Sequence, residues 1–345
     1  MREDPGLDVG RIAACLGAQY DLHVASVVFL PIGYDPNAAV YEVVARDGTP
    51  YFLKVRSGPV HEPGLLVPRA LIDRGIRNVL APLRTRSSGL WCPLDGSDGH
   101  TAVLYPFVRG ENAMVAGLSD DQWREFGSTL RAVHESGLGE RFRGRLQVES
   151  FALPSAALVR RLLALADETE FESAAGARFA AFWREHAERI RRMLTRAEEL
   201  GGALQTTPFE LVLCHADIHA ANVLVGGDGR IWLVDWDGPL IAPRERDLLF
   251  VVGSRIARPV EPREEDLFFE GYGAAEIDPA ALVYYRYERI VEDLGEIGKS
   301  VFLDPNLSEQ ARGEEAELAM SFFAPDGDID RAETVARRRW PCASA

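Results

Sequence analysis

The chain has 345 residues and a formal net charge of −15, from 53 acidic and 38 basic residues. Apolar residues make up 47% and charged residues 26%, values that are ordinary for a globular protein of one large or two medium domains. The acidic balance argues against nucleic acid as a partner, because phosphate backbones are bound by basic surfaces, and it is compatible with a cationic ligand.

The sequence also predicts a cytoplasmic protein without a membrane partner. No apolar run approaches the roughly 20 residues that cross a bilayer. The segment MREDPGLDVG at the start is acidic and polar, so we expect no secretory signal. The four cysteines lie far apart and lack the spacing of a metal site, which is typical of a reducing compartment.

The first third of the chain predicts a helix followed by a small antiparallel sheet. Apolar residues at helical spacing indicate a helix within residues 1–24, and a second helix is expected at 61–74. Apolar runs separated by turn residues indicate short strands joined by loops. The expected strands are residues 25–30, 39–45, 50–55, 78–83, 90–94 and 101–108.

Lysine is scarce in this chain, because only Lys54 and Lys299 are present beside 36 arginines. Such a bias is typical of a GC-rich genome, in which arginine serves wherever charge alone matters. A lysine that is present nevertheless predicts a place that needs a compact ammonium group. Lys54 lies between apolar residues of a predicted strand, so its side chain is expected on one face of the sheet. An ordinary exposed strand lysine is the alternative.

The middle of the chain predicts mainly helices. Ser119 is the expected N-cap of a helix over residues 119–136, in which His134 is expected to be structural. Residues 140–205 are rich in Arg, Glu, Ala and Leu and predict two or three helices. One of them is expected at 179–200, closed by the glycine pair at 201 and 202.

The most informative stretch is 211–237, LVLCHADIHAANVLVGGDGRIWLVDWD. An apolar run ends in His215-Ala-Asp217, and Asn222 follows Asp217 by five residues. Two short strands with a glycine-rich turn between them predict a hairpin that brings Asn222 and Asp235 together. Carboxylate and carbonyl oxygens are ligands that Mg²⁺ prefers. The alternative is a hairpin whose Asp and Asn residues serve only turns and caps.

This stretch resembles the catalytic and metal-binding segments of protein kinases and is similar to those of the aminoglycoside phosphotransferase family. The segments HADIHAANVLVG and DWDGPLIAPRERDL together look most like the spectinomycin phosphotransferase branch. The resemblance implies an α+β, bilobal protein-kinase-like fold. A small antiparallel-sheet lobe is expected at 1–106 and a large, mainly helical catalytic and substrate-binding lobe at 107–345, with a helical insertion at about 140–205.

The resemblance also implies ATP, with GTP as an alternative, and Mg²⁺ as cofactors. Asp217 would orient the acceptor hydroxyl and take its proton, while Asn222 and Asp235 would hold the metal. Lys54 would grip the α and β phosphates. Its candidate partner is Glu62, the only carboxylate between residues 54 and 73, for which an ordinary helix-start acid is the alternative.

The loop at 31–37 lies where kinases carry a glycine-rich loop, but Gly33 is its only glycine. Phosphate contact would then rest on backbone amides between Asp35 and Ala38 and on the Asn37 side chain, with an ordinary hairpin loop as the alternative. The next implied feature is a hinge between the lobes whose backbone binds adenine. The candidate hinge residues are Tyr105, Phe107 and Val108, and the sequence leaves open which of them binds adenine.

Two further residues are implied as support, since His215 would order the loop and Asp247 would accept backbone hydrogen bonds from it.

Residues 261–330 hold 19 acidic against 5 basic residues, and the helix predicted at 284–296 is acidic and aromatic. We expect this helix to face a cationic, hydroxylated substrate, with a solvated acidic face as the alternative. The candidate substrate residues are Asp237, which would place a metal-bound water or a substrate amine, Tyr285, Glu288, Glu292 and Asp293.

The resulting hypothesis is an ATP-dependent O-phosphotransferase that acts on an aminoglycoside or aminocyclitol antibiotic such as spectinomycin and confers resistance. Another hydroxylated natural product or metabolite is the alternative acceptor, as in a producer that protects itself, and choline, homoserine and fructosamine kinases look similar in the same core. A catalytically silent kinase-fold binding protein is the rival from another class. A protein kinase is disfavoured, because Asp-Phe-Gly and Ala-Pro-Glu segments are absent from the sequence. We expect a monomer or dimer.

Overall fold

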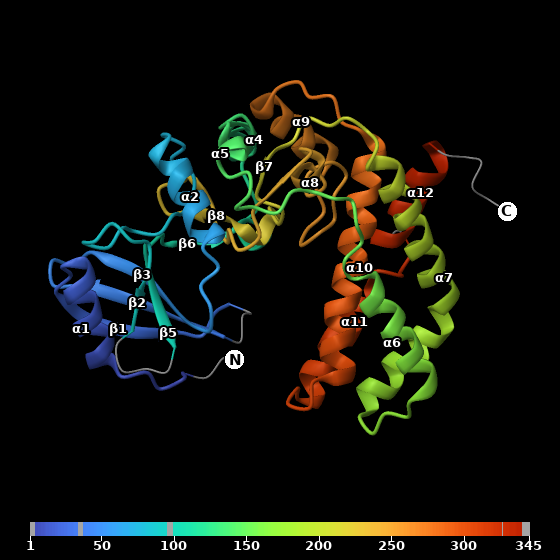
Figure 1. The fold of residues 1–345 in the computed structure, drawn as a ribbon, viewed down its shortest axis with the longest axis horizontal. Helices are drawn as coiled ribbons and strands as arrows, with labels where there is room; N and C mark the ends of the chain where they lie inside the picture. Colours follow the sequence, from blue (N-terminus) through green and yellow to red (C-terminus); the bar gives the residue numbers. More distant parts are fainter. Residues whose placement is uncertain (1–3, 34–36, 95–98, 326, 340–345) are drawn as a thin grey trace. The chain divides into compact units, whose positions relative to one another are not determined.

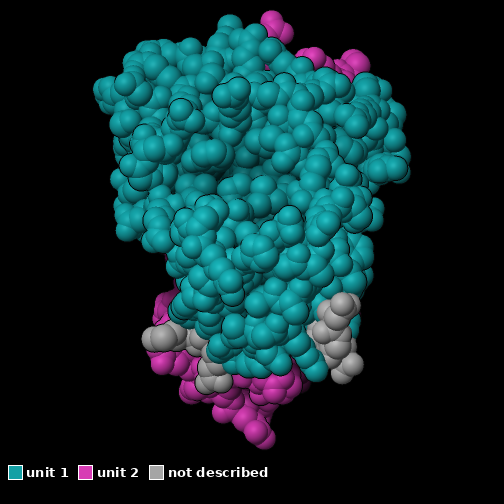
Figure 2. Space-filling model, turned by 90° about the vertical axis from the view of Figure 1, so that its left-hand side faces the viewer, with its two compact units in different colours: residues 1–147, 212–241, 260–274 teal, residues 148–211, 242–259, 275–345 magenta. Residues whose placement is uncertain are grey.

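The computed structural model describes residues 4–33, 37–94, 99–325 and 327–339 (Figure 1). The chain divides into two compact units, drawn in teal and magenta in Figure 2. The predicted boundary between lobes at 106 and 107, with its helical insertion, stays a prediction. Unit 1 comprises residues 1–147, 212–241 and 260–274, and unit 2 comprises residues 148–211, 242–259 and 275–345.

Unit 1 contains a five-stranded antiparallel sheet, as the sequence predicted for the small lobe. Its strand order is β1-β2-β3-β5-β4. Helix α1 (Val9–Tyr20), capped by the Asp8 side chain, packs its apolar residues Ile12 and Leu16 into a core with one face of the sheet. The strands are β1 (Val24–Leu30), β2 (Ala38–Ala45), β3 (Pro50–Ser57), β4 (Cys92–Pro93) and β5 (His100–Pro106).

The register of this sheet places Lys54 on the face opposite α1. Leu53 and Val55 belong to the core that α1 covers, so the intervening Lys54 points to the other face. On β5 it stands opposite Val103, and Val103 packs with Leu65 of helix α2 (Pro63–Asp73). The predicted alternation of Lys54 with its apolar neighbours is therefore confirmed.

The strand predicted at residues 78–83 is wrong. Val79 makes a single parallel bridge to Leu233, and the Leu80 amide donates to the Leu233 carbonyl at 2.9 Å. The segment forms no sheet strand of its own, because it bonds at its start to the strand that ends at Leu233 and at its end to β5, where the Leu83 amide donates to the Leu104 carbonyl at 2.7 Å. The strand predicted at 90–94 shortens to the two residues of β4.

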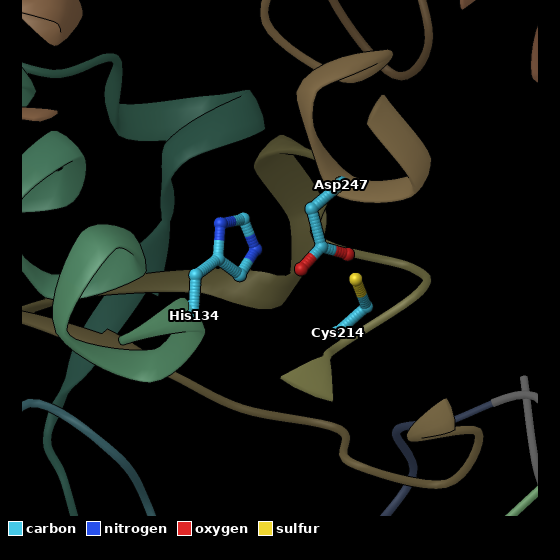
Figure 3. A group of neighbouring side chains, drawn as sticks. All are labelled: His134, Cys214 and Asp247. Carbon is cyan, nitrogen blue, oxygen red and sulfur yellow. The ribbon is translucent and has the colours of Figure 1, made fainter. Parts of the chain in front are cut away.

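The rest of unit 1 carries a second, three-stranded sheet and a helical pair. Ser119 caps α4 with a capping box to Gln122, which confirms the predicted N-cap. His134, whose ring is drawn in Figure 3, lies in the last turn of α4, and its Nδ1 bonds the Tyr272 hydroxyl at 2.7 Å. The elements are β6 (Gly110–Asn112), β8 (Val223–Gly226) and β9 (Ile231–Leu233), the pair β7 (Val212–Cys214) and β10 (Leu240–Ala242), and helices α3 (Ala113–Ala116), α4 (Asp120–His134), α5 (Leu138–Arg141) and α9 (Pro262–Tyr272).

Helices α4 and α9 approach each other through two glycines. A Cβ atom at Gly127 of α4 would overlap the Phe268 carbonyl, and one at Gly271 of α9 would overlap the Arg124 carbonyl. Each helix thus presents a glycine to the backbone of the other. The close approach depends on the absence of a side chain at both positions.

We expect Gly271→Ala to lower the free energy of unfolding by about 3 kcal/mol, because the added methyl group meets rigid helix backbone. Urea unfolding followed by circular dichroism measures the change. Gly202→Ala is the matched control, since Gly202 lies in a helix with nothing within 4 Å of its Cβ position. The control should gain up to about 0.5 kcal/mol from helix propensity. Equal stabilities of the two variants would contradict the interlocked packing.

Unit 2 is helical, and in it α6, α7, α10 and α11 lie side by side (Figure 1). The helix predicted at 179–200 does not stop at its glycine pair, because α7 continues through both glycines. At Gly201 the helix packs closely on another backbone segment, because a Cβ atom there would overlap the Phe151 carbonyl. No helix in the described part of the chain is long and apolar enough to cross a membrane. The helices are α6 (Ala156–Glu168), α7 (Ala174–Leu204), α8 (Glu245–Leu248), α10 (Pro279–Leu303), α11 (Glu309–Ser321) and α12 (Asp328–Arg339).

Candidate functional site

The hairpin predicted from the sequence is present in unit 1. β8 pairs with β9 in antiparallel register, with Val223 opposite Leu233. A 3-10 turn, η1 (Ala220–Asn222), precedes β8. At the open end the Val234 amide donates to the Asn222 carbonyl at 3.0 Å. This bond brings Asn222 next to the segment that leads into Asp235, as the spacing predicted.

His215 is fully buried and ties the two sides of this open end together. Its Nε2–H donates to the Val234 carbonyl at 2.8 Å, and its Nδ1 accepts from the Asp217 amide at 3.4 Å. These two contacts assign the neutral tautomer with the proton on Nε2. The ring packs on Trp236, with centroids 4.4 Å apart. His215 therefore positions the backbone on which Asp217 stands.

Asp217 presents a partly exposed carboxylate beside two polar neighbours. The Asn222 amide group donates to the Asp217 carbonyl at 2.8 Å and lies 3.4 Å from its Oδ2. The His219 Nε2 lies 3.5 Å from the same Oδ2, and the Asp217 side chain is 40% exposed. An oriented carboxylate that solvent can reach is suited to accept a proton from a hydroxyl.

Two residues beside these groups hold strained backbone. Ala216 has φ +73° and Asp235 has φ +61°, both in the left-handed region that non-glycine residues rarely occupy. Such strain costs about 1–3 kcal/mol at each residue and is typical of functional sites, where surrounding structure holds it in place. These φ values turn the backbone just before Asp217 and at Asp235 itself.

Asn222 and Asp235 fit a divalent cation by the chemistry of their donors. Because the amide hydrogens of Asn222 point to Asp217, its Oδ1 is the atom left to act as a ligand. Burial raises the pKa of the Asp235 carboxyl, and the charges of Asp237 and Asp217 raise it further, while the charge of Lys54 lowers it. A cation at this place would relieve the repulsion among the carboxylates.

The structure pairs Lys54 with Asp237. The Lys54 Nζ lies 3.2 Å from the Asp237 Oδ2, with the lysine side chain 22% exposed and the aspartate 55% exposed. Glu62 is the N-cap residue of α2 and makes no side-chain capping bond there. The predicted pair of Lys54 with Glu62 stays a prediction, and Asp237 is the partner that sequence reasoning did not assign. The repeated aspartate of Asp235-Trp-Asp237 was the available signal.

A glycine that sequence reasoning missed brings α2 against this segment. A Cβ atom at Gly64 would lie 2.8 Å from the Trp236 carbonyl oxygen and 3.5 Å from the Asp237 Cα. The first turn of α2 therefore packs directly on the backbone that carries Asp237. A glycine directly after Pro63, in the first turn of a predicted helix, was the signal for a close approach.

A sequence model of the phosphotransferase enzyme family matches residues 28–283. The chain belongs to this family. A crystal structure of spectinomycin phosphotransferase, APH(9)-Ia, in complex with ADP and spectinomycin is 30% identical, with a TM-score of 0.85 over 96% of this chain and 99% of that chain. The AMP-bound complex of spectinomycin phosphotransferase is 29% identical, with a TM-score of 0.80 over 95% of this chain and 98% of that chain.

A third solved structure shows the fold alone. Amicoumacin kinase in complex with AMP-PNP, Ca²⁺ and Ami is 17% identical, with a TM-score of 0.60 over 94% of this chain and 97% of that chain. No curated protein matches the sequence. The predicted kinase-like fold and the predicted family are confirmed, and the protein is a phosphotransferase with an alcohol group as acceptor.

In this phosphotransferase the predicted hinge lies at the end of β5. Tyr105 is a residue of β5, and its ring meets Phe52 edge-to-face at 6.2 Å. Burial raises the pKa of the Tyr105 phenol, and the charges of Asp237 and Asp235 add to the shift. Phe107 and Val108 follow in the segment between β5 and β6. Their binding of adenine stays a prediction.

The phosphate loop is described only in part. Asp35 lies outside the described residues. The carbonyl of Asn37 accepts from the Ser57 amide at 2.8 Å, which holds the start of β2 to the end of β3. The phosphate contacts expected from this loop stay predictions.

The predicted substrate residues of α10 lie in unit 2, where two of the acids are paired with arginines. Glu288 forms an ion pair with Arg246 of α8, and both side chains are 12% exposed. The Arg246 guanidinium also lies 5.5 Å from the centroid of the fully buried Tyr285 ring. Asp293 pairs with Arg289 at 3.1 Å. Glu292 is exposed, so among the four predicted substrate residues of α10 its carboxylate is the most accessible to solvent.

Asp247 also lies in unit 2, in the short helix α8 (Figure 3). It is fully buried, and its carbonyl accepts from the Phe250 amide at 3.1 Å. A buried carboxylate requires partners. The support that Asp247 was predicted to give to the loop stays a prediction, as do the substrate roles of the α10 residues.

The buried pair of Arg246 in α8 and Glu288 in α10 makes the free energy of unfolding depend on pH. Burial raises the pKa of Glu288 to about 7, against the opposing charge of Arg246. In the unfolded chain the pKa of a glutamate is about 4.3. Between this pKa and that of the folded state, Glu288 of the folded protein holds a proton that the unfolded chain has lost. The contribution of Glu288 is therefore present at low pH and is lost as pH rises through about 7.

We expect Glu288→Gln to remove this dependence, so that the free energy of unfolding falls less steeply from about pH 5 to about pH 7 than in the wild type. Urea unfolding at the two pH values measures the slopes. Glu296→Gln on the exposed side of α10 is the control and should keep the wild-type slope. A wild-type slope in Glu288→Gln would show that Glu288 titrates alike in both states.

Proposed function

We propose that this phosphotransferase transfers the γ-phosphate of ATP to a hydroxyl of spectinomycin or of a related aminocyclitol antibiotic, in the presence of Mg²⁺, and so confers resistance. The observation that carries the proposal is the open end of the hairpin, where Asp217 and Asn222 meet through a hydrogen bond and Asp235 follows β9. The similarity to a spectinomycin phosphotransferase over 96% of the chain supports this acceptor class.

In the proposed reaction the acceptor oxygen attacks the γ-phosphorus, and the bond from that phosphorus to the β–γ bridging oxygen breaks. Asp217 orients the hydroxyl and takes its proton late in a loose transition state. Asn222 Oδ1 and the Asp235 carboxylate are the groups that would hold Mg²⁺, which neutralises phosphate charge when bound. Lys54, now held by Asp237, would contact the α and β phosphates.

The remaining predicted residues keep their roles within the proposal. Glu62 would join Lys54 from the start of α2, and Asp237 would place a metal-bound water or a substrate amine. The lobe at 1–106 would hold the nucleotide. Residues proposed for phosphate and adenine contact are Asp35, Asn37, Tyr105, Phe107 and Val108; those for support are His215 and Asp247; those for the cationic acceptor are Tyr285, Glu288, Glu292 and Asp293.

Transfer of radiolabel from [γ-³²P]ATP to a panel of acceptors tests the proposal. We expect label on spectinomycin and none on choline or homoserine, which separates an aminocyclitol kinase from the metabolite kinases of similar core. A sensitive bacterial host that expresses the protein should grow at raised spectinomycin concentrations. Bound ATP with no transfer to any acceptor would identify a catalytically silent binding protein and overturn the proposal.

The packing of Gly64 on residues 236–237 gives a further prediction for this activity. We expect Gly64→Ala to lower kcat/KM by at least about tenfold, since the methyl group displaces the segment that holds Asp235 and Asp237, and small misplacements at a reacting centre are costly. Steady-state kinetics with ATP and the best acceptor measure it. Gly17→Ala in α1, whose Cβ would lie 3.7 Å from the Leu22 carbonyl, is the control. Wild-type kcat/KM in Gly64→Ala would contradict the positioning role.

A further inference from the structure

Unit 1 contains a pocket of about 590 Å³ that is distinct from the hairpin site. It lies between α2, the segment 84–91 and residues 141–145 at the end of α5 and just after it. Its lining includes Glu62, the proposed partner of Lys54, but none of Lys54, Asp217, Asn222 and Asp235. This volume lies within the range of about 300–1,000 Å³ that small-molecule sites occupy. The pocket is therefore large enough for a small molecule and lies apart from the groups proposed to carry the chemistry.

The charge of the lining is opposite to that of the protein. Four arginines, Arg69, Arg84, Arg141 and Arg145, line the pocket with only two acids, Glu62 and Asp73, in a chain of net charge −15. Low-dielectric walls strengthen the field of such a cluster at a concave site. The pocket is thus a local positive site on an acidic protein.

One of the two acids is already neutralised. Asp73 accepts from Arg69 at 2.8 Å and from Arg84 at 2.6 Å. Burial acts to raise the pKa of Asp73, but the hydrogen bonds and charges of the two guanidinium groups outweigh it and hold the pKa below its ordinary value. Arg69 and Arg84 therefore form a fixed, preorganised side of the pocket.

The other two arginines are available for a ligand. Arg141 and Arg145 are exposed, and within the described ranges the structure gives neither of them an ion pair. Arg143, between them in the sequence, is exposed as well but pairs with Glu140 at 2.6 Å and does not line the pocket. The same short segment thus holds two arginines directed to the pocket and one that is not.

The pocket also has an apolar side. Leu65 and Leu90 are buried in one small core with Val103, and Phe142 is buried. Trp91 is a large apolar side chain that remains 36% exposed, and it lines the pocket. An aromatic ring beside guanidinium groups favours a planar apolar body that carries negative charge.

We propose that this pocket binds a small organic dianion with an aromatic or other planar apolar body. Arg141 and Arg145 contact its two anionic groups, since guanidinium forks bind carboxylate or phosphate oxygens through paired hydrogen bonds. Trp91 covers the apolar body. The site is separate from the catalytic hairpin, so binding requires neither nucleotide nor metal.

Calorimetric titration of the full-length protein with phthalate, in metal-free buffer without nucleotide, tests the proposal. We expect one site, and a Kd that rises at least about tenfold in the double variant Arg141→Gln/Arg145→Gln, since each lost charge-assisted pair weakens binding. Arg143→Gln should keep the wild-type Kd. Benzoate, with one charge, should bind more weakly than phthalate.

Two results would overturn the proposal. One is wild-type protein that binds no phthalate at about 10 mM, where a Kd near 1 mM is readily measured. The other is a Kd that is the same in the wild type and in the double variant. The single variants Arg141→Gln and Arg145→Gln keep the test decisive if the double variant loses its cooperative thermal unfolding, and each should weaken binding by at least about threefold.

Discussion

Replacing Asp217 with asparagine is expected to lower kcat by about a thousandfold, the scale of a lost general base. Asparagine has the shape of aspartate and keeps an oxygen that can accept from the Asn222 amide group, so the loop should hold its conformation. The nucleotide does not need the proton acceptor, so the Kd for ATP should stay within about twofold of the wild type. Rapid-quench transfer assays and calorimetry measure the two quantities.

The control for this change is Asp228→Asn. Asp228 lies in the turn at the other end of the hairpin, where its Oδ1 accepts from the Arg230 amide at 3.1 Å. We expect wild-type kcat in the control. If Asp217→Asn retained wild-type kcat as well, Asp217 would not be the proton acceptor. If it lost ATP affinity to the same degree as kcat, the residue would serve the nucleotide instead.

Replacing Asp235 with asparagine is expected to lower kcat/KM by about a thousandfold and to raise the Mg²⁺ concentration for half-maximal activity at least about tenfold. The substitution removes the charge without a new backbone cost, because asparagine tolerates the left-handed conformation that Asp235 holds at φ +61°. An alanine at position 235 would add backbone strain, and the effect of that strain on activity would be mixed with the effect of the lost charge.

Titration of activity with Mg²⁺ separates this variant from Asp217→Asn. Loss of a metal ligand shifts the titration, whereas loss of the proton acceptor lowers the plateau without a shift. Asp235→Asn with a wild-type midpoint for Mg²⁺ would contradict the assignment of Asp235 to the metal. If the Mg²⁺ midpoint shifted only in Asp217→Asn, Asp217 would be the metal ligand and Asp235 the proton acceptor.

The hairpin could be predicted from the sequence because its information is local. Two apolar strands with the glycine turn between them specify the pairing of Val223 with Leu233, and the pairing brings Asn222 toward Asp235. The face of Lys54 was predictable for the same reason, since side chains alternate along a strand. In each of these cases the relevant neighbours lie within one hairpin or one strand.

The features that were missed or wrong depend on contacts between distant segments. Whether Lys54 meets Glu62 or Asp237 is decided by how α2 and the hairpin pack, and Gly64 shows its purpose only beside Trp236. Gly201 looked like a helix end because glycine is common after helices. Its position inside α7 follows from the Phe151 backbone that packs on it.

The most direct test of the central claim is ³¹P NMR of spectinomycin incubated with ATP, Mg²⁺ and the wild-type protein, beside an identical sample with Asp217→Asn. The account predicts a new phosphomonoester signal that grows as the γ-phosphate signal of ATP falls, with one ester formed for each ADP, and no such signal in the variant sample within the same time. Release of inorganic phosphate without an ester, or an ester formed equally fast by the Asp217→Asn variant, would contradict it.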